Sequence, residues 1–311
     1  MSDFKIYAAP LQGYTEAAWR SFHTRLFGGI DEYFTPFLRV EKGEVRRSDL
    51  RDILSPLNDG VKITPQIIFG NVDEFRLLAD TLSELGFDRV DINMGCPFPP
   101  QVHHGRGAGL ISNTELLEAV SEEISQRPHI TFSIKMRLGA VSVDEWRRAM
   151  PIINRMQLRH VTLHPRIATQ QYRGELNYHE AEAFAAECAH PLIFNGDIQR
   201  AADISKLQTR IPSIVGVMLG RGLLARPTLA MEYRSGTETS DDEIVRGIVT
   251  LHQAIYNATA PTLCGDAQIL AKMKPYWEYA SFYLDRKAVK TVLKARTAAA
   301  YLDAAGKVTG F

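Results

Sequence analysis

Residues 89–95 read Arg-Val-Asp-Ile-Asn-Met-Gly, a short run of β-branched and apolar residues that ends at a glycine. Runs of this kind indicate buried β-strands. Seven similar runs lie on either side of it, at 6–11, 32–38, 64–70, 130–138, 160–166, 191–198 and 216–222. Apolar residues at helical spacing lie between most of these runs, at 72–86, 113–126, 144–156 and 200–208. Strands that alternate with helices pair in parallel, so the pattern predicts an α/β protein with a (β/α)8 TIM barrel.

The pattern of polar and apolar residues changes after residue 235. Residues 235–243 read Ser-Gly-Thr-Glu-Thr-Ser-Asp-Asp-Glu, a polar run typical of a connection between domains. Beyond it, apolar residues such as Ile244, Ile248, Leu251 and Ile255 recur at helical intervals. We therefore expect a barrel domain over residues 1–235 and a small helical domain over residues 242–311.

The composition is that of an ordinary globular protein, with 45% hydrophobic and 23% charged residues in a chain of 311. No stretch approaches the ~18 uninterrupted apolar residues of a membrane span, and the first residues do not form a secretion signal. We expect a cytoplasmic monomer with no membrane partner. The three cysteines, Cys96, Cys188 and Cys264, are too widely separated for a CxxC metal site, so no metal is expected.

Positive charge is concentrated near the end of the chain. Basic and acidic residues both number 36, so the total charge gives no hint of a polyanionic partner. Residues 265–311, however, hold four acidic residues against eight basic ones: Lys272, Lys274, Arg286, Lys287, Lys290, Lys294, Arg296 and Lys307. This basic tail either binds phosphates or is an ordinary solvated helical face.

Chemically capable side chains stand at the ends of the expected strands, where barrel enzymes carry their active sites. They include Gln66, Asn93, Cys96, Lys135, Arg137, His164, Arg166, Asn195, Asp197 and Arg221. The last two strands are followed by glycine-bearing turns at 195–197 and 220–222, where backbone N–H groups can approach a phosphate closely. A phosphate-bearing ligand is therefore expected.

The residues alone leave several roles open. Cys96 is either a packed small hydrophobe or a proton donor or nucleophile at the mouth of the barrel. Lys135 is either a buried amine paired with Asp91, a Schiff-base lysine, or a cation that stabilises an anionic cofactor ring. His164 is either a core histidine whose ring nitrogens are hydrogen-bonded within the protein or, with Arg166, a contact for an anion.

Several stretches resemble the tRNA-dihydrouridine synthases, flavin enzymes built as a (β/α)8 barrel followed by a helical domain. The most specific is Asn-Met-Gly-Cys-Pro at 93–97, followed by Lys-Met-Arg at 135–137. Other matching stretches occur in the family's order at 8–16, 65–70, 105–110, 164–166, 195–197 and 220–222. The tail at 272–279 resembles the C-type subgroup, which implies modification of the uridine at position 16.

The resemblance implies reduction of a D-loop uridine of tRNA to 5,6-dihydrouridine, with FMN as cofactor and NADPH as reductant. By position, Cys96 would be the general acid that protonates C5 of the uracil, and Lys135 would stabilise the anion of reduced flavin. The other flavin contacts that it implies are Ala9, Pro10, Leu11, Gln66, His164, Asn195, Gly196, Asp197, Gly220 and Arg221. The substrate contacts that it implies are Asn93, Arg137, Arg166, Lys272 and Lys274.

Two other functions fit part of this pattern. An FMN barrel that reduces a free pyrimidine or another small enone would not need the basic tail. A non-catalytic tRNA-binding protein would need the tail but not the set Cys96, Lys135 and His164. A synthase must extract its uridine from a folded tRNA into the pocket, and segregated charge lets a chain of zero net charge bind RNA.

Overall fold

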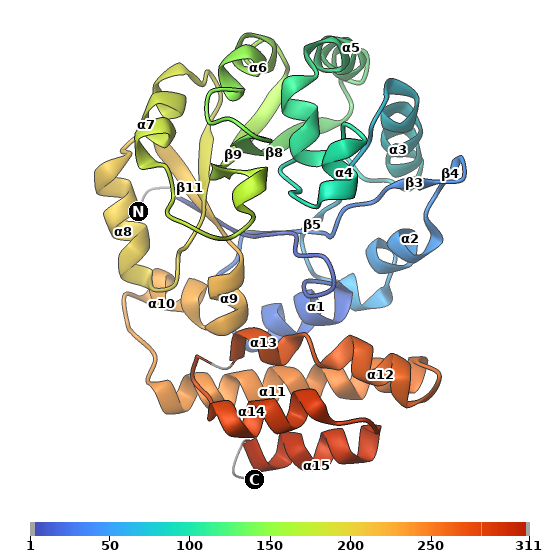
Figure 1. Cartoon of the computed structure of the whole chain (residues 1–311), viewed down its shortest axis with the longest axis vertical. Helices are drawn as coiled ribbons and strands as arrows, with labels where there is room; N and C mark the ends of the chain where they lie inside the picture. The colour runs from blue at the N-terminus through green and yellow to red at the C-terminus, as the bar shows by residue number, and fades with distance from the viewer. Residues whose placement is uncertain (1–3, 281, 309–311) are drawn as a thin grey trace.

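Nine parallel strands form a ring in the computed structural model, which describes residues 4–280 and 282–308. They are β1 (Lys5–Ala8), β2 (Glu32–Phe34), β5 (Ile63–Thr64), β6 (Gln66–Ile67), β7 (Arg89–Met94), β8 (Thr131–Gly139), β9 (Leu158–Ile167), β10 (Leu192–Asn195) and β11 (Ile214–Leu219). Their order is β5-β2-β1-β11-β10-β9-β8-β7-β6. The expected TIM barrel is confirmed (Figure 1).

The third expected strand differs from the prediction because Pro65 divides it. β5 pairs with β2 before the proline, and β6 pairs with β7 after it. Proline has no N–H to donate to a ladder, so the strand is interrupted where the chain passes from one neighbour to the other. The two short pieces together occupy one place in the ring, so nine segments make the eight positions of the barrel.

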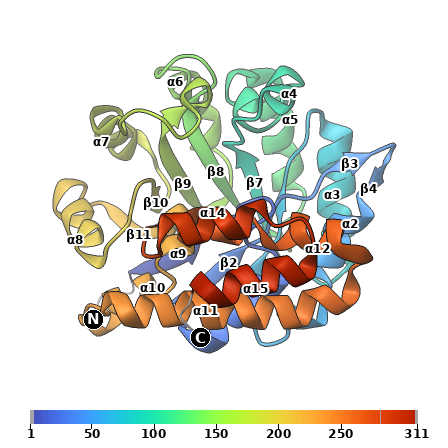
Figure 2. The same cartoon turned by 60° about the horizontal axis from the view of Figure 1, so that its bottom comes forward.

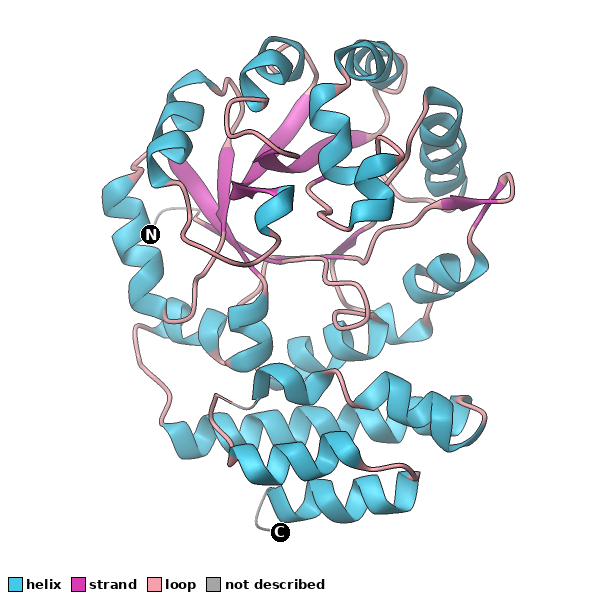
Figure 3. Ribbon diagram, viewed as in Figure 1, coloured by secondary structure: helices cyan, strands magenta, loops and turns pink. Residues whose placement is uncertain are grey.

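Helices surround the ring, as Figure 3 shows. The four expected ones are confirmed as α3 (Val72–Glu84), α5 (Thr114–Ser125), α6 (Trp146–Ile153) and α8 (Ala201–Arg210). The others around the barrel are α1 (Ala17–Leu26), α2 (Arg47–Ile53), α4 (Pro99–His103), α7 (Tyr178–Glu187), α9 (Arg221–Ala225) and α10 (Leu229–Ser235). A small hairpin of β3 (Val40–Glu41) and β4 (Glu44–Val45) was not expected.

Apolar and polar layers alternate inside the ring. A small apolar cluster lies within the barrel and comprises Tyr7, Ala9, Phe34, Ile193 and Met218. Polar side chains that face inward from neighbouring strands are also buried: Glu32, Thr64, Asp91, Ser133, His160 and Thr162. A TIM barrel usually fills these layers with branched apolar residues. In this protein, the layer beneath the mouth of the barrel is instead polar.

The C-terminal helices lie against one side of the barrel. They are α11 (Asp241–Thr259), α12 (Gly265–Met273), α13 (Tyr276–Ala280), α14 (Arg286–Lys294) and α15 (Ala298–Val308), and Figure 2 shows them from the side where they come forward. Helix α11 packs on α1. One apolar core cluster contains Trp19 of the barrel together with Ile248 and Trp277 of this helical region. The division into two domains therefore stays a prediction. No helix of the described residues has the length and apolar character to cross a membrane.

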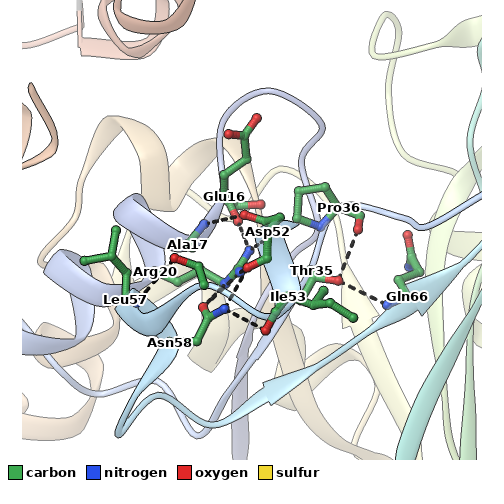
Figure 4. Close-up of polar contacts among 12 residues, drawn as sticks. Glu16, Ala17, Arg20, Thr35, Pro36, Asp52, Ile53, Leu57, Asn58 and Gln66 are labelled. Atoms are coloured by element: carbon green, nitrogen blue, oxygen red, sulfur yellow. Dashed lines mark hydrogen bonds and ion pairs between the residues drawn. The ribbon is translucent and has the colours of Figure 1, made fainter. Parts of the chain in front are cut away.

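A buried arginine organises the part of the barrel nearest the helical region (Figure 4). The guanidinium of Arg20 is fully buried and donates to the carbonyl of Thr15 at 2.7 Å, to Asp52 at 2.9 Å and to Asn58 at 2.9 Å. Asp52 also accepts a hydrogen bond from the backbone N–H of Ala17 at 2.7 Å. Because every donor meets an acceptor, the buried charge fixes α1 against the segment that follows α2.

Candidate active site

A cavity of about 760 Å³ opens at the C-terminal ends of the strands, the position that barrel enzymes use for catalysis. Its lining joins the loop after β1 to residues of β7–β11 and to the segment around α13. Most of the residues expected from the sequence line it: Ala9, Pro10, Leu11, Asn93, Cys96, Lys135, Arg137, His164, Arg166, Asn195, Gly196, Asp197, Gly220 and Arg221.

Cys96 is held on a turn that Asn93 closes. The Asn93 Oδ1 atom accepts hydrogen bonds from the backbone N–H of Gly95 at 3.0 Å and of Cys96 at 2.8 Å. Gly107 lies against this turn, because a Cβ there would stand 2.7 Å from the Cys96 Cβ. Burial raises the pKa of the Cys96 thiol, against opposing effects of a backbone hydrogen bond with Phe98 and the charge of Arg137. The thiol is therefore protonated at neutral pH and can donate that proton.

Lys135 presents an unpaired ammonium to the cavity. Within the described residues its Nζ has no hydrogen bond or ion pair, and Asp91 does not pair with it because that carboxyl is bonded to Gln66 and Ser133 instead. Burial lowers the pKa of Lys135 to about 8, with the neighbouring charge of Arg137 acting in the same direction. An anion in the cavity would relieve both effects.

The opposite wall carries a hydrogen-bonded cluster from the ends of β9–β11. Arg166 donates two hydrogen bonds to Asp197, at 3.1 and 2.5 Å, and Arg221 donates a third at 2.8 Å. The Arg166 Nη1 atom also lies 3.1 Å from His164 Nε2. A guanidinium only donates, so this nitrogen of His164 accepts and its proton resides on Nδ1. Burial and the surrounding cations keep the pKa of His164 well below its usual range, so the ring is neutral.

These residues fit FMN. The cavity is large enough for a flavin mononucleotide, since cofactor pockets run from roughly 300 to 1,000 Å³. Lys135 can supply a cation for an anionic ring, and Arg221 and the backbone around Gly196, which line the same cavity, can hold a phosphate group. Gly222 also lines the cavity, and a Cβ there would collide with the carbonyl oxygen of Ile198. That glycine permits close packing of two loops.

Three expected ligand contacts make internal hydrogen bonds. Gln66 is fully buried, does not line the cavity, and bonds to Asp91 and Asn93 through its side-chain amide. Asn195 donates to the carbonyl of Met218 at 2.6 Å, which ties β10 to β11. Arg137 donates to the carbonyls of Gly95, Ile167 and Gln171 at 2.9, 3.0 and 2.7 Å. Arg137 therefore joins the Cys96 turn to the loop after β9.

Two expected substrate contacts, Lys272 and Lys274, have partners within the protein. Lys272 forms an ion pair with Glu16, and only 17% of its side chain is exposed. Lys274 donates to the carbonyl of Ala295 at 2.6 Å. Both side chains serve packing between elements, so neither presents a free cation to RNA. Within the described residues, five other basic side chains of the tail are exposed and form no ion pair: Arg286, Lys287, Lys290, Lys294 and Arg296.

Sequence reasoning missed the aromatic part of the wall. Tyr172 follows β9 and is 45% exposed, with the guanidinium carbon of Arg221 4.6 Å from its ring centroid and that of Arg137 5.4 Å from it. Tyr279, Phe282 and Tyr283 reach the same cavity from the helical region. The aromatic run between residues 276 and 283 was the available signal. No group of three or more His, Cys, Asp or Glu residues in the described ranges is arranged to hold a metal ion.

Comparison with known proteins gives consistent matches. Residues 7–300 match the family model described as dihydrouridine synthase. The chain is 29% identical over 229 residues to the probable tRNA-dihydrouridine synthase 2 of Bacillus subtilis, covering 70% of this chain and 69% of that protein. It is 27% identical over 250 residues to the tRNA-dihydrouridine(16) synthase of Neisseria meningitidis serogroup A, covering 77% and 74%.

Solved structures give the same fold at low identity. Morphinone reductase superposes with a TM-score of 0.51 at 12% identity, over 76% of this chain and 87% of that one. The old yellow enzyme from Trypanosoma cruzi superposes with a TM-score of 0.52 at 10% identity, over 76% and 89%. At identities this low, the superpositions show that the barrel fold is shared and nothing further.

Proposed function

The chain belongs to the dihydrouridine synthase family, and we propose that it reduces the uridine at position 16 of tRNA to 5,6-dihydrouridine with NADPH as electron donor. The family makes it a flavin-dependent oxidoreductase. The observation that carries the proposal is one cavity that holds a protonated thiol, an unpaired ammonium and a wall of aromatic side chains. The relatives named for position 16 support the choice of uridine.

The cavity residues have separable roles in this reaction. FMN, when bound, supplies the hydride that reduces C6 of the uracil. Cys96 donates the proton to C5, and its raised pKa keeps that proton on the thiol at neutral pH. With FMN bound, the ammonium of Lys135 would stabilise negative charge on the reduced ring. His164, Arg221 and the backbone at Gly196, which line the same cavity, would hold the phosphate end.

The aromatic wall and the helical region suit an extracted base. A base taken out of a folded RNA is held by stacking, and Tyr172, Tyr279 and Phe282 line the cavity. The exposed cations of α14 lie in the helical region whose α13 borders the opening, so they can contact phosphates that flank the extracted nucleotide.

The decisive experiment separates the two half-reactions. Enzyme reconstituted with FMN is reduced by NADPH or by NADH and then mixed with tRNA that lacks dihydrouridine. We expect reoxidation by this tRNA, faster flavin reduction by NADPH, and dihydrouridine at position 16 when the product is mapped. Reoxidation by free uridine or a small enone, but not by tRNA, would overturn the RNA substrate. Dihydrouridine at another position would overturn the choice of uridine alone.

A further inference from the structure

A chain of buried hydrogen bonds connects an unassigned carboxyl group to the Cys96 turn. The Asp91 Oδ2 atom accepts from Gln66 Nε2 at 2.6 Å, and Gln66 Oε1 accepts from Asn93 Nδ2 at 2.7 Å. Asn93 Oδ1 then accepts from the backbone N–H of Gly95 and of Cys96 at 3.0 and 2.8 Å. Asp91, Gln66 and Asn93 are buried, and Gln66 is fixed further by its backbone N–H, which donates to Thr35 Oγ1 (Figure 4).

The backbone N–H groups at one end fix which amide atom donates and which accepts along this chain of hydrogen bonds. Backbone N–H groups only donate, so Asn93 must present its oxygen to Cys96 and its NH2 to Gln66. Gln66 must then present its oxygen to Asn93 and its NH2 to Asp91. Such a chain is complete only if residue 91 accepts a hydrogen bond. With no acceptor there, a buried amide N–H is left without a partner, and turning the Gln66 amide would break its bond to Asn93.

We propose that Asp91 is a positioning residue for uridine reduction, which accepts from Gln66 and thereby orients Asn93 to hold the Cys96 turn. The proposal rests on the proposed function, since it concerns the placement of the proton donor. Ser133 donates to the other carboxyl oxygen at 2.5 Å and keeps Asp91 in place. Asp91 itself does not line the cavity, so it acts through these neighbours and does not contact the substrate.

A second role for Asp91 has to be separated from this one. Its charge also acts on Lys135, where it opposes the lowering of the lysine pKa. The two roles predict different responses to substitution. Asp91→Asn removes the charge but keeps an oxygen that can accept from Gln66. Asp91→Leu keeps the branching at Cγ and removes both. A positioning role requires that Asn largely preserve activity and Leu not, whereas a charge role requires equal losses.

The test measures single-turnover reoxidation of reduced enzyme by tRNA, normalised to bound flavin. We expect Asp91→Leu to slow this step at least tenfold, because misplacing a reacting group by about 1 Å can cost as much as 100-fold. Asp91→Asn should stay within roughly threefold of wild type, since the acceptor is retained. Flavin reduction by NADPH should change little in both variants. Equal losses in the Asn and Leu variants would overturn the proposal.

A double variant distinguishes failure of this proposal from failure of the proposed function. If Asp91 acts through Cys96, then Asp91→Leu has no further effect on reoxidation in a Cys96→Ala background. Full additivity would overturn the positioning role. A Cys96→Ala variant with wild-type reoxidation would instead overturn the assignment of Cys96 as the proton donor.

Alkylation gives a readout that does not depend on turnover. The full-length holoenzyme is treated with iodoacetamide, and each cysteine peptide is quantified by mass spectrometry. Releasing the turn should expose the thiol, so Asp91→Leu should speed Cys96 alkylation about fivefold or more, because thiol reactivity follows access and thiolate fraction. Half-buried Cys188 reports general loosening and should be unchanged. If Asp91→Leu does not fold, Gln66→Met cuts the same chain, and unchanged Cys96 alkylation in that variant would overturn the proposal.

Discussion

The cavity and the helical region use charge in opposite ways. In the cavity, Lys135 has no ion-pair partner within the described residues, and the buried guanidinium of Arg166 is paired with the carboxylate of Asp197. On α14, Lys287, Lys290 and Lys294 are exposed and unpaired within the described part of the chain. Burial makes a single charged or polar group energetically important, whereas exposed charges are screened and act only together. Single substitutions in the cavity should therefore have large effects, and those on α14 small ones.

The largest effect should come from Cys96→Ala. General acid catalysis contributes roughly 10²–10⁴-fold, so dihydrouridine formation should fall by that factor while FMN binding and NADPH oxidation by oxygen persist. Single-turnover reoxidation by tRNA and the thermal midpoint should be measured on the same variant. If Cys96 were merely a packed side chain, the midpoint would fall and the rate per folded molecule would stay within about threefold of wild type.

Lys135→Met should produce two effects of opposite sign. Loss of the ammonium should disfavour reduction of the flavin by about 2–4 kcal/mol, measured as a lower flavin midpoint potential. Without FMN the variant should be more stable at pH 7, because the folded protein holds an unpaired buried cation whose pKa is lowered to about 8. That penalty is fully present below pH 8 and disappears as the pH rises towards the unfolded value near 10.5.

Thermal unfolding of the FMN-free protein at pH 7 and at pH 10 checks the sign. The Met variant should unfold about 1–2 °C higher than wild type at pH 7, the shift that ~1 kcal/mol gives in a chain of this size. The difference should shrink at pH 10. A Met variant that is less stable at pH 7 would show that Lys135 has a favourable partner in the folded state.

Asp197→Asn should weaken the paired wall of the cavity. It leaves the buried guanidinium of Arg166 without its carboxylate, which should lower the free energy of unfolding by about 2 kcal/mol, given that Asp197 is partly exposed. Asp80→Asn is the matched control, because Asp80 also binds an arginine, Arg127, but is half exposed. Urea denaturation measures both. Equal losses would contradict the distinction between buried and exposed charge.

The smallest effect per residue should come from α14. Changing Lys287, Lys290 and Lys294 together to Glu should raise the KM for tRNA and leave flavin reduction unchanged. The log–log salt dependence of tRNA binding should flatten by roughly 0.7–0.9 for each phosphate that the protein no longer neutralises. Lys206→Glu, an exposed lysine on α8, gives the control for a change of charge alone. An unchanged salt slope in the triple variant would place the RNA surface elsewhere.

Local sequence predicted the barrel and most of the cavity lining, because both follow from strand position. Cys96 follows β7, and Lys135 and His164 lie on β8 and β9; the parallel ring brings all three to one cavity. The split at Pro65 follows from its missing N–H, but which neighbours the two halves choose depends on the closed ring.

Pairings between distant residues could not be predicted in this way. Lys272 pairs with Glu16, and nearly the whole barrel sequence separates the two residues. No local sequence pattern predicts this pairing. Gln66 likewise begins β6, but its side-chain amide hydrogen-bonds to Asp91 and Asn93 inside the barrel. Whether a polar side chain at such a position faces a ligand or a neighbour depends on the side chains opposite it, which only the tertiary structure supplies.

The loop between β1 and α1 has a consequence for recombining parts of this protein. Its first residues, Ala9 to Leu11, line the cavity, while Tyr14 donates to Glu278 at 2.6 Å and Glu16 pairs with Lys272. The helical region is thus not an interchangeable module. A chimera that took residues 236–311 from a relative would also have to take this loop, and with it part of the cavity wall. Divergence of the helical region and of the barrel mouth is coupled at these few positions.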